Sequence, residues 1–263
     1  MVNCFEQAKR VVVKVGTSTL TYDTGLINIR HLEKLVKTLS DLKNSGKDVI
    51  LVSSGAIGVG VGKLGLKERP QDTPSKQAAA SVGQCELMYL YDKLFAEYNH
   101  TISQVLITRD SIDDPVRKQH VVNTFERLMD YGAIPIVNEN DTVSVEEIEF
   151  GDNDTLSAIV ATIAQADVLV VKTDVDGLYD ADPRTCENAK LIRQVVQVDD
   201  DLMAKASGAG TRRGTGGMIT KLNAAQFAME HGIDMAIVNG KDPYILYRLF
   251  EGQQVGTHFI RKG

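Results

Sequence analysis

The sequence predicts an α/β fold in which a mainly parallel sheet is sandwiched between helices. Short runs rich in β-branched residues alternate with longer amphipathic stretches along the 263 residues, which is the pattern of βαβ units. These runs are almost continuously apolar, as expected of strands that helices cover on both faces. Several runs end in hydroxyl, amide or glycine residues, so a ligand crevice is expected at the carboxyl edge of the sheet.

Six strands and six helices are expected to alternate. The strands are predicted at residues 11–15, 49–52, 102–107, 133–137, 168–171 and 235–238, and the helices at 29–44, 75–98, 118–131, 154–165, 218–231 and 243–251. Residues 142–150 alternate polar and apolar side chains and predict an exposed antiparallel hairpin. No Pro-, Gly- or Ser-rich linker and no internal repeat divides the chain, so residues 1–263 are expected to form a single domain.

Composition narrows the classes of partner and the compartment. The formal net charge of −6 argues against general binding to nucleic acid or to an anionic membrane. No run of about 20 apolar residues is present, and the apolar stretch near the N-terminus is too short for a signal peptide. Three scattered cysteines fit neither a disulfide framework nor a zinc site. We therefore expect a cytoplasmic protein.

Charge is distributed unevenly along the chain. Residues 139–154 hold seven acids and no base, whereas residues 202–229 hold four bases and no acid. One interpretation is a solvated acidic hairpin and a solvated basic loop. The other is a cationic pocket for phosphates that faces an acidic wall for an ammonium group or a metal.

Two common phosphate-binding motifs are excluded. Gly60-Val-Gly62-Lys-Leu-Gly65 matches G-x-G-x-x-G, but the Rossmann turn requires its first glycine directly after the strand, and several residues intervene here. The same segment lacks the first glycine of a Walker A loop. It also has Leu64 where that loop needs Ser or Thr.

A lysine interrupts the first predicted strand. Lys14 shares a strand face with Val12 in a run otherwise suited to burial, and an unpaired buried ammonium group is strongly unfavourable. Lys14 is therefore expected to pair with an anion or to lie at the carboxyl end of the strand. There Gly16 permits close approach, and Thr17 and Ser18 supply donors for a phosphate. The alternative is an edge strand whose lysine reaches solvent.

Polar side chains also follow other predicted strands. Ser53 and Ser54 end the second strand, residues 138–141 end the fourth, and residues 151–154 open a helix after the predicted hairpin. Each of these could be a helix cap. Together, at one edge of a parallel sheet, they predict a binding crevice.

A further polar segment is rich in glycine and leads into a helix. Residues 214–217 precede a helix whose apolar stripe includes Ile219 and Leu222, and Lys221 lies about 200° from Ile219. Lys221 is therefore expected to face away from the core, in a first turn where a cation opposes the helix dipole unless an anion binds. A flexible loop is the alternative to a phosphate site.

Six segments in this order resemble the amino acid kinase superfamily, over essentially the whole chain. They are VKVGTS, VSSGAI, NENDTV, GDND, KTDVDGLY and GTGGMITK. Thr17 and Ser18 follow Gly16, where acetylglutamate kinases and aspartokinases usually carry paired glycines. This favours the glutamate 5-kinase branch, and the resemblance implies the amino acid kinase fold.

The resemblance further implies ATP- and Mg²⁺-dependent phosphorylation of the side-chain carboxylate of L-glutamate, the first step of proline synthesis. Motif by motif, it implies an ATP site at Lys14, Thr173, Asp174, Thr215, Gly216, Gly217, Met218, Ile219, Thr220 and Lys221. It implies a glutamate site at Ser54, Asp141 and Asn153, and leaves the metal ligands undefined. The catalytic residues would be Lys14 and Lys221, oriented by Asp154.

The residue types agree with this chemistry. A carboxylate nucleophile is already ionised at neutral pH, so no general base is needed, and none of the six segments contains a histidine. Two lysines would neutralise charge on the transferring group, and Asp141 suits the α-ammonium group of an amino acid. A non-catalytic nucleotide or amino-acid sensor would not need both lysines. A kinase of N-acetylglutamate or carbamate is the nearer alternative.

The family implies further partners. These are proline as a feedback inhibitor at the glutamate site, glutamyl phosphate reductase as the next enzyme, and self-association as a dimer or tetramer. Two departures stand out: Ser53 replaces a threonine common in the family, and the sequence ends at Gly263, so the C-terminal PUA domain of many relatives is not expected.

Overall fold

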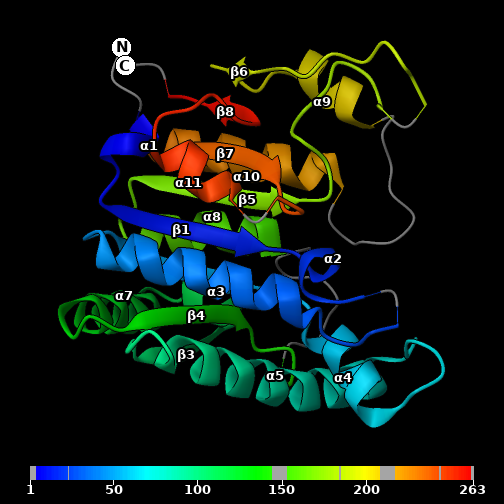
Figure 1. Cartoon of the computed structure of the whole chain (residues 1–263), viewed down its shortest axis with the longest axis vertical. Coiled ribbons are helices and arrows are strands. Elements are labelled where there is room, and N and C mark those ends of the chain that lie inside the picture. Colours follow the sequence, from blue (N-terminus) through cyan, green and yellow to red (C-terminus); the bar gives the residue numbers. More distant parts are fainter. Residues whose placement is uncertain are drawn as a thin grey trace.

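The computed structural model is a three-layer sandwich with an eight-stranded sheet in the middle layer (Figure 1). It describes residues 4–22, 24–143, 153–183, 185–207, 217–242 and 244–261. The predicted fold class is confirmed. Most of the predicted hairpin at 142–150 lies outside the described residues. Within the described ranges, no helix combines the length and apolarity needed to cross a bilayer.

The sheet places the lysine-bearing first strand at its centre. The strands are β1 (Arg10–Val15), β2 (Asp48–Ser53), β3 (Ile102–Ile107), β4 (Ile134–Glu139), β5 (Val168–Thr173), β6 (Gln194–Val195), β7 (Asp234–Asn239) and β8 (Thr257–Phe259). Their order is β3-β4-β2-β1-β5-β7-β8-β6, and only β7 and β8 pair antiparallel. Because β1 pairs with β2 and β5, the edge-strand interpretation of Lys14 is wrong.

The six predicted helices are all present, with ends within about three residues of expectation. They are α3 (Ile29–Asn44), α5 (Thr73–Ala96), α7 (Pro115–Asp130), α8 (Asn153–Ile163), α10 (Met218–Glu230) and α11 (Ile245–Phe250). Sequence reasoning missed α1 (Cys4–Gln7), α2 (Thr17–Leu20), α4 (Ala56–Leu64), α6 (Asp110–Asp113) and α9 (Asp200–Ser207), as well as the short strands β6 and β8. Most of these are single turns or two to three residues long, too short to show a period.

Alternation along the central strands directs side chains into two cores. Val11 and Val13 of β1 face the core shared with α3, α5 and α11, whereas Val12 faces the core shared with α7, α8 and α10. Since side chains alternate along a strand, Lys14 points with Val12 toward α8 and α10. By the same rule, Lys172 of β5 points with Val170 toward α3.

The glycines of the discarded G-x-G-x-x-G segment have a packing function. Gly60 and Gly62 lie in α4, and Gly65 is its C-cap. Helix α4 packs against α5 so closely that a Cβ on Gly60 would stand 1.8 Å from the Ala79 carbonyl oxygen. A Cβ on Gly83 of α5 would likewise stand 1.8 Å from the Ala56 carbonyl oxygen. Three glycines give α4 a low intrinsic helix propensity, so this contact stabilises the helix that follows the β2 serines.

Replacing Gly83 with alanine is expected to lower the free energy of unfolding by about 2 kcal/mol or more, because the added methyl group must force the two helices apart. Urea denaturation measures the loss. Ser81→Ala, at an exposed position of the same helix, is the matched control and should be nearly neutral. Equal stability of Gly83→Ala and wild type would refute the close-packing interpretation.

Candidate active site

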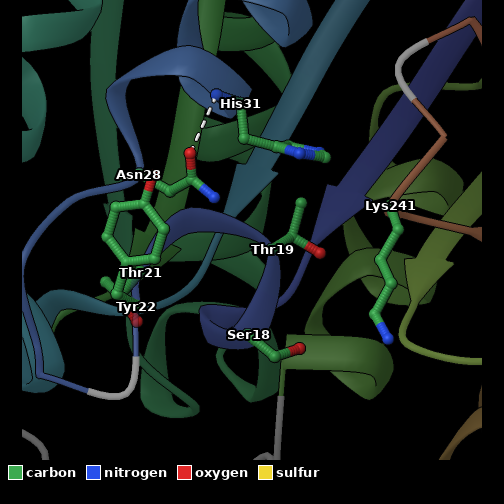
Figure 2. Close-up of a pocket in the computed structure, with 7 residues that line it drawn as sticks. All are labelled: Ser18, Thr19, Thr21, Tyr22, Asn28, His31 and Lys241. Atoms are coloured by element: carbon green, nitrogen blue, oxygen red, sulfur yellow. Dashed lines mark hydrogen bonds between the residues drawn. The ribbon is translucent and has the colours of Figure 1, made fainter.

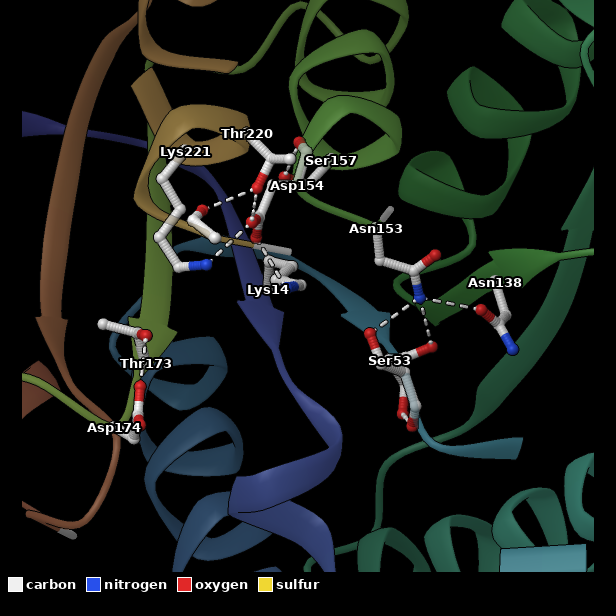
Figure 3. Close-up of polar contacts among 12 residues, drawn as sticks. Lys14, Ser53, Asn138, Asn153, Asp154, Ser157, Thr173, Asp174, Thr220 and Lys221 are labelled. Carbon is white, nitrogen blue, oxygen red and sulfur yellow. Dashed lines mark hydrogen bonds and ion pairs between the residues drawn. The ribbon is translucent and has the colours of Figure 1, made fainter. Parts of the chain in front are cut away.

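A buried aspartate joins the two predicted phosphate lysines. Asp154 is 0% exposed; Lys14 Nζ lies 2.6 Å from its Oδ1 and Lys221 Nζ lies 2.9 Å from its Oδ2 (Figure 3). Thr220 Oγ1 lies 3.0 Å from the same Oδ2 and 2.8 Å from the Gly217 carbonyl oxygen. Lys14 is 140 positions and Lys221 is 67 positions away from Asp154 in the sequence, yet both contact its carboxylate.

Three elements hold this cluster at the carboxyl edge of the sheet. Lys14 comes from β1, Lys221 from the first turns of α10, and Asp154 from the first turn of α8, where a negative charge is favoured by the helix dipole. The Ser157 hydroxyl donates to the Asp154 carbonyl oxygen at 2.6 Å. Asp154 is therefore fixed by its helix and by both lysines.

The charges of the cluster decide its protonation state. Burial opposes ionisation of Asp154, but the charges of Lys14 and Lys221, each donating a hydrogen bond, outweigh burial and hold its pKa well below the usual range. Asp154 is thus a permanent anion. With two cations and one anion, the cluster carries a net positive charge that suits a phosphate group.

The prediction that Lys221 of α10 faces away from the core is wrong. Lys221 is 6% exposed and buried against α8, while Ile219 is 39% exposed. The buried face of α10 includes Leu222, as expected, together with Ala225, but Asp154 supplies the counter-charge that lets a lysine join it. The anion that was expected to offset the helix dipole at Lys221 is therefore this aspartate.

A second polar cluster surrounds Asn153, the residue before Asp154 (Figure 3). Its Nδ2 lies 2.8 Å from Ser54 Oγ, 3.1 Å from the Ser53 carbonyl oxygen and 2.9 Å from Asn138 Oδ1. The ends of β2 and β4 and the start of α8 are thereby joined. Asn153 makes these contacts instead of capping its own helix.

Sequence reasoning missed the outer members of this second cluster. Asn138 is 3% exposed and donates to Gln84 Oε1 of α5 at 3.0 Å, and Ser53 Oγ lies 2.8 Å from the Tyr91 hydroxyl. Burial raises the pKa of the Tyr91 phenol well above its usual range, so the phenol stays neutral. Gln84 and Tyr91 lie in the long helix α5 outside any motif of the sequence, so only the fold reveals their contacts.

Asp141 differs from Asp154 in having no counter-charge. It lies two residues beyond β4, and its carboxylate has no hydrogen-bond or ion-pair partner in the described part of the chain. Burial, with a smaller contribution from Glu139, raises its pKa to about 6. An unpaired, partly desolvated carboxylate is suited to receive a cation from a ligand.

The other predicted ATP residues that the structure describes lie at the end of β5 and at the start of α10. Thr173 ends β5, and its hydroxyl donates to Asp174 Oδ1 at 3.1 Å. Gly217 is the N-cap of α10, followed by half-buried Met218 and by Ile219. Thr215 and Gly216 lie outside the described residues.

Comparisons with known proteins agree with this geometry. Residues 9–239 match the model of the amino acid kinase family. A glutamate 5-kinase of Clostridium perfringens is 52% identical over 266 residues, which covers 100% of this chain and 99% of that protein. Glutamate 5-kinases of Listeria welshimeri and Clostridium tetani are 52% and 53% identical and cover 98% and 97% of this chain, with 95% of each relative covered.

A solved structure supports the fold. The UMP kinase of Bacillus anthracis superposes with a TM-score of 0.63 at 18% identity, covering 96% of both chains. At that identity the likeness extends to the fold alone.

Replacing Asp154 with asparagine is expected to lower the free energy of unfolding by about 3–5 kcal/mol, because two buried ammonium groups lose their counter-charge. Urea denaturation at neutral pH measures this. Asp130→Asn is the matched control: its carboxylate is 60% exposed and pairs with Arg127 at the surface, so the loss should stay below about 1 kcal/mol. An equally small loss in Asp154→Asn would contradict its role as the shared counter-ion.

Proposed function

The chain belongs to the amino acid kinase family, and we propose that it phosphorylates the side-chain carboxylate of L-glutamate with ATP, forming L-glutamyl 5-phosphate for proline biosynthesis. The observation that carries the proposal is the pair of lysines held by one buried aspartate beside the Asn153 cluster. The named relatives supply the choice of substrate.

The reaction needs alignment and charge stabilisation more than proton transfer. A carboxylate oxygen of glutamate forms a bond to the γ-phosphorus while the bond from that phosphorus to the β,γ-bridging oxygen breaks, and ADP leaves. The nucleophile is ionised at neutral pH, so no side chain has to remove a proton. Lys14 and Lys221 stabilise the charge that develops on the phosphoryl and leaving oxygens.

Asp154 positions the two lysines. Each of its oxygens engages one ammonium group, so the lysines are held on either side of one carboxylate. Preorganised charge of this kind needs no rearrangement during the reaction. Asp154 acts through Lys14 and Lys221 and does not serve as a base.

Mg²⁺ is proposed to enter with the nucleotide. Both Asp154 oxygens already face lysines, so this carboxylate is not free to serve as a metal ligand. Mg²⁺ commonly retains water and substrate phosphate oxygens as ligands. Bound there, the ion would add positive charge along the phosphate chain, while Lys14, Lys221 and the start of α10 hold the phosphates.

The two substrates are proposed to occupy adjoining sites. Glutamate would contact Ser54, Asn153 and Asp141, whose carboxylate would receive the α-ammonium group. The nucleotide would contact Thr173, Asp174 and residues 215–221. Asn153 and Asp154 are consecutive, so the two sites share one helical turn of α8.

Proline feedback, supply of product to glutamyl phosphate reductase, self-association and a cytoplasmic location form part of the same proposal. Their support is the family resemblance and the identity of the relatives.

Trapping the acyl phosphate with hydroxylamine tests the proposed reaction. The enzyme with ATP and L-glutamate should give the hydroxamate, and N-acetylglutamate or carbamate should not replace glutamate. Equal turnover of N-acetylglutamate would favour the alternative kinase, and no turnover of any of them would favour a sensor.

Replacing Lys221 with methionine is expected to lower kcat more than tenfold, which corresponds to about 1.4 kcal/mol or more of lost transition-state stabilisation. Methionine is chosen because Lys221 is buried and a truncation would leave a cavity. Circular dichroism verifies the fold. Lys63→Met, at a surface lysine, is the control; wild-type kcat in folded Lys221→Met would remove Lys221 from the mechanism.

Replacing Asp141 with asparagine is expected to raise the KM for glutamate at least tenfold and to change the KM for ATP little, because a charge-assisted pair contributes about 1.5–3 kcal/mol. The pH profile provides a second readout. The pKa of Asp141 is raised to about 6, so below that pH the wild-type carboxyl is neutral and kcat/KM for glutamate should fall.

In Asp141→Asn, that decline near pH 6 should disappear. Asp113→Asn, an exposed surface change, should retain it.

Without glutamate, Asp141→Asn should also be more stable than wild type at neutral pH. The raised pKa means that the folded state holds a proton that the unfolded state releases, so wild-type stability falls as pH rises from about 3.8 to about 6. A wild-type KM for glutamate in Asp141→Asn would refute ammonium recognition by Asp141.

A further inference from the structure

A second polar cavity lies on the opposite face of the sheet from Asp154. It has a volume of about 320 Å³ and is lined by Ser18, Thr19, Thr21, Tyr22, Asn28, His31 and Lys241 (Figure 2). These residues come from α2 and the segment after it, the start of α3, and the residue two positions after β7. Since α3 covers the face opposite to α8 and α10, this cavity is separate from the lysine cluster.

The cavity offers donors and cations that have no partner. Thr19 is 7% exposed, and its hydroxyl has no hydrogen-bond partner in the described part of the chain. His31 Nε2 is buried and also lacks one. The Lys241 ammonium group stands at the exposed side without an ion pair to any described residue, and Asn28 is already engaged as the N-cap of α3.

A buried lysine adds charge beneath this cavity. Lys172 is 2% exposed and has no hydrogen bond or ion pair with any described residue. It flanks Gly240 together with Thr19: a Cβ on Gly240 would stand 2.7 Å from Thr19 Oγ1 and 3.4 Å from Lys172 Cβ. Burial lowers the pKa of the His31 imidazole, and the positive charge of Lys172 lowers it further. The charge of Lys172 is therefore felt at the cavity.

An unpaired buried ammonium group is strongly unfavourable, and natural proteins normally give it a counter-charge, as Asp154 does for Lys14 and Lys221. The described lining residues of the cavity include no carboxylate. The volume falls at the lower end of the range for ligand pockets, which suits a small ligand. Burial lowers the pKa of Lys172 to about 8, so most of the ammonium group is still protonated at neutral pH. An anion from solution would supply the counter-charge that the described residues do not.

We propose that this cavity binds a small oxyanion, a phosphate or carboxylate group, through Thr19, His31 and Lys241, which line it, while Lys172 adds positive charge from beneath. The site is distinct from that of the transferred phosphoryl group and goes beyond the proposed kinase activity. Helix α2, which lines the cavity, begins directly after Gly16, and Gly16 is two residues from Lys14. The anion would therefore bind beside the segment that follows the Lys14 strand.

Histidine NMR tests the proposal without measuring activity. The chain has five histidines, so imidazole signals of a histidine-labelled sample are few, and His31→Gln assigns the signal of His31. Inorganic phosphate and acetate are titrated separately into the wild type, with chloride at matched ionic strength as the reference. Lys172→Met and Lys241→Met are the test variants, and Lys37→Met, an exposed lysine of α3, is the matched control.

A saturable shift of the His31 signal that chloride does not produce is expected. Saturation by phosphate alone indicates a phosphorylated ligand, and saturation by acetate alone indicates a carboxylate ligand. The dissociation constant should rise at least tenfold in Lys172→Met, rise also in Lys241→Met, and stay unchanged in Lys37→Met. The proposal is overturned if neither anion saturates the shift, or if both test variants bind as the wild type does.

Discussion

The carboxylate of Asp154 is the interaction on which the rest of the site depends. Two lysines from elements far apart in sequence could not be buried side by side without it, because each ammonium group would repel the other in a poorly solvated space. The fold brings α8 against both β1 and α10 to deliver this charge. The proposed binding of a phosphate group and the packing of three elements therefore rely on the same three side chains.

The sheet uses the alternation of its side chains to separate two polar regions at one edge. Lys14 points with Val12 toward α8 and α10, where Asp154 compensates its charge, whereas Lys172 points with Val170 toward α3, where no described carboxylate does. The parallel arrangement of β1 and β5 places both residues near the carboxyl edge. The two lysines thus sit in neighbouring strands but in different electrostatic environments.

The strands and long helices were predictable because their apolar periods are clear, and the polar strand ends indicated the edge of the sheet where Lys14 and Asn153 make their contacts. The pairing of Lys14 and Lys221 with Asp154 was foreseen only through the family resemblance, since the partners lie on separate elements. The orientation of Lys221 was predicted wrongly because the apolar stripe of α10 places this lysine on the solvent side. Only the position of α8, which brings Asp154 to Lys221, explains why the lysine is buried. Gln84 and Tyr91 carry no local motif, and the motif that begins at Lys172 does not reveal its surroundings, so these contacts follow from tertiary packing alone.

The two aspartates of the site show how environment divides their roles. Asp154 is more deeply buried, yet two lysines hold its pKa down, so it remains charged and cannot exchange protons during turnover. Asp141 is less buried but unpaired, and burial together with Glu139 raises its pKa. Carboxyl groups whose pKa values are displaced in opposite directions serve different purposes. Asp154 is satisfied within the protein and organises it, whereas the unmet charge of Asp141 is available to a cationic ligand group.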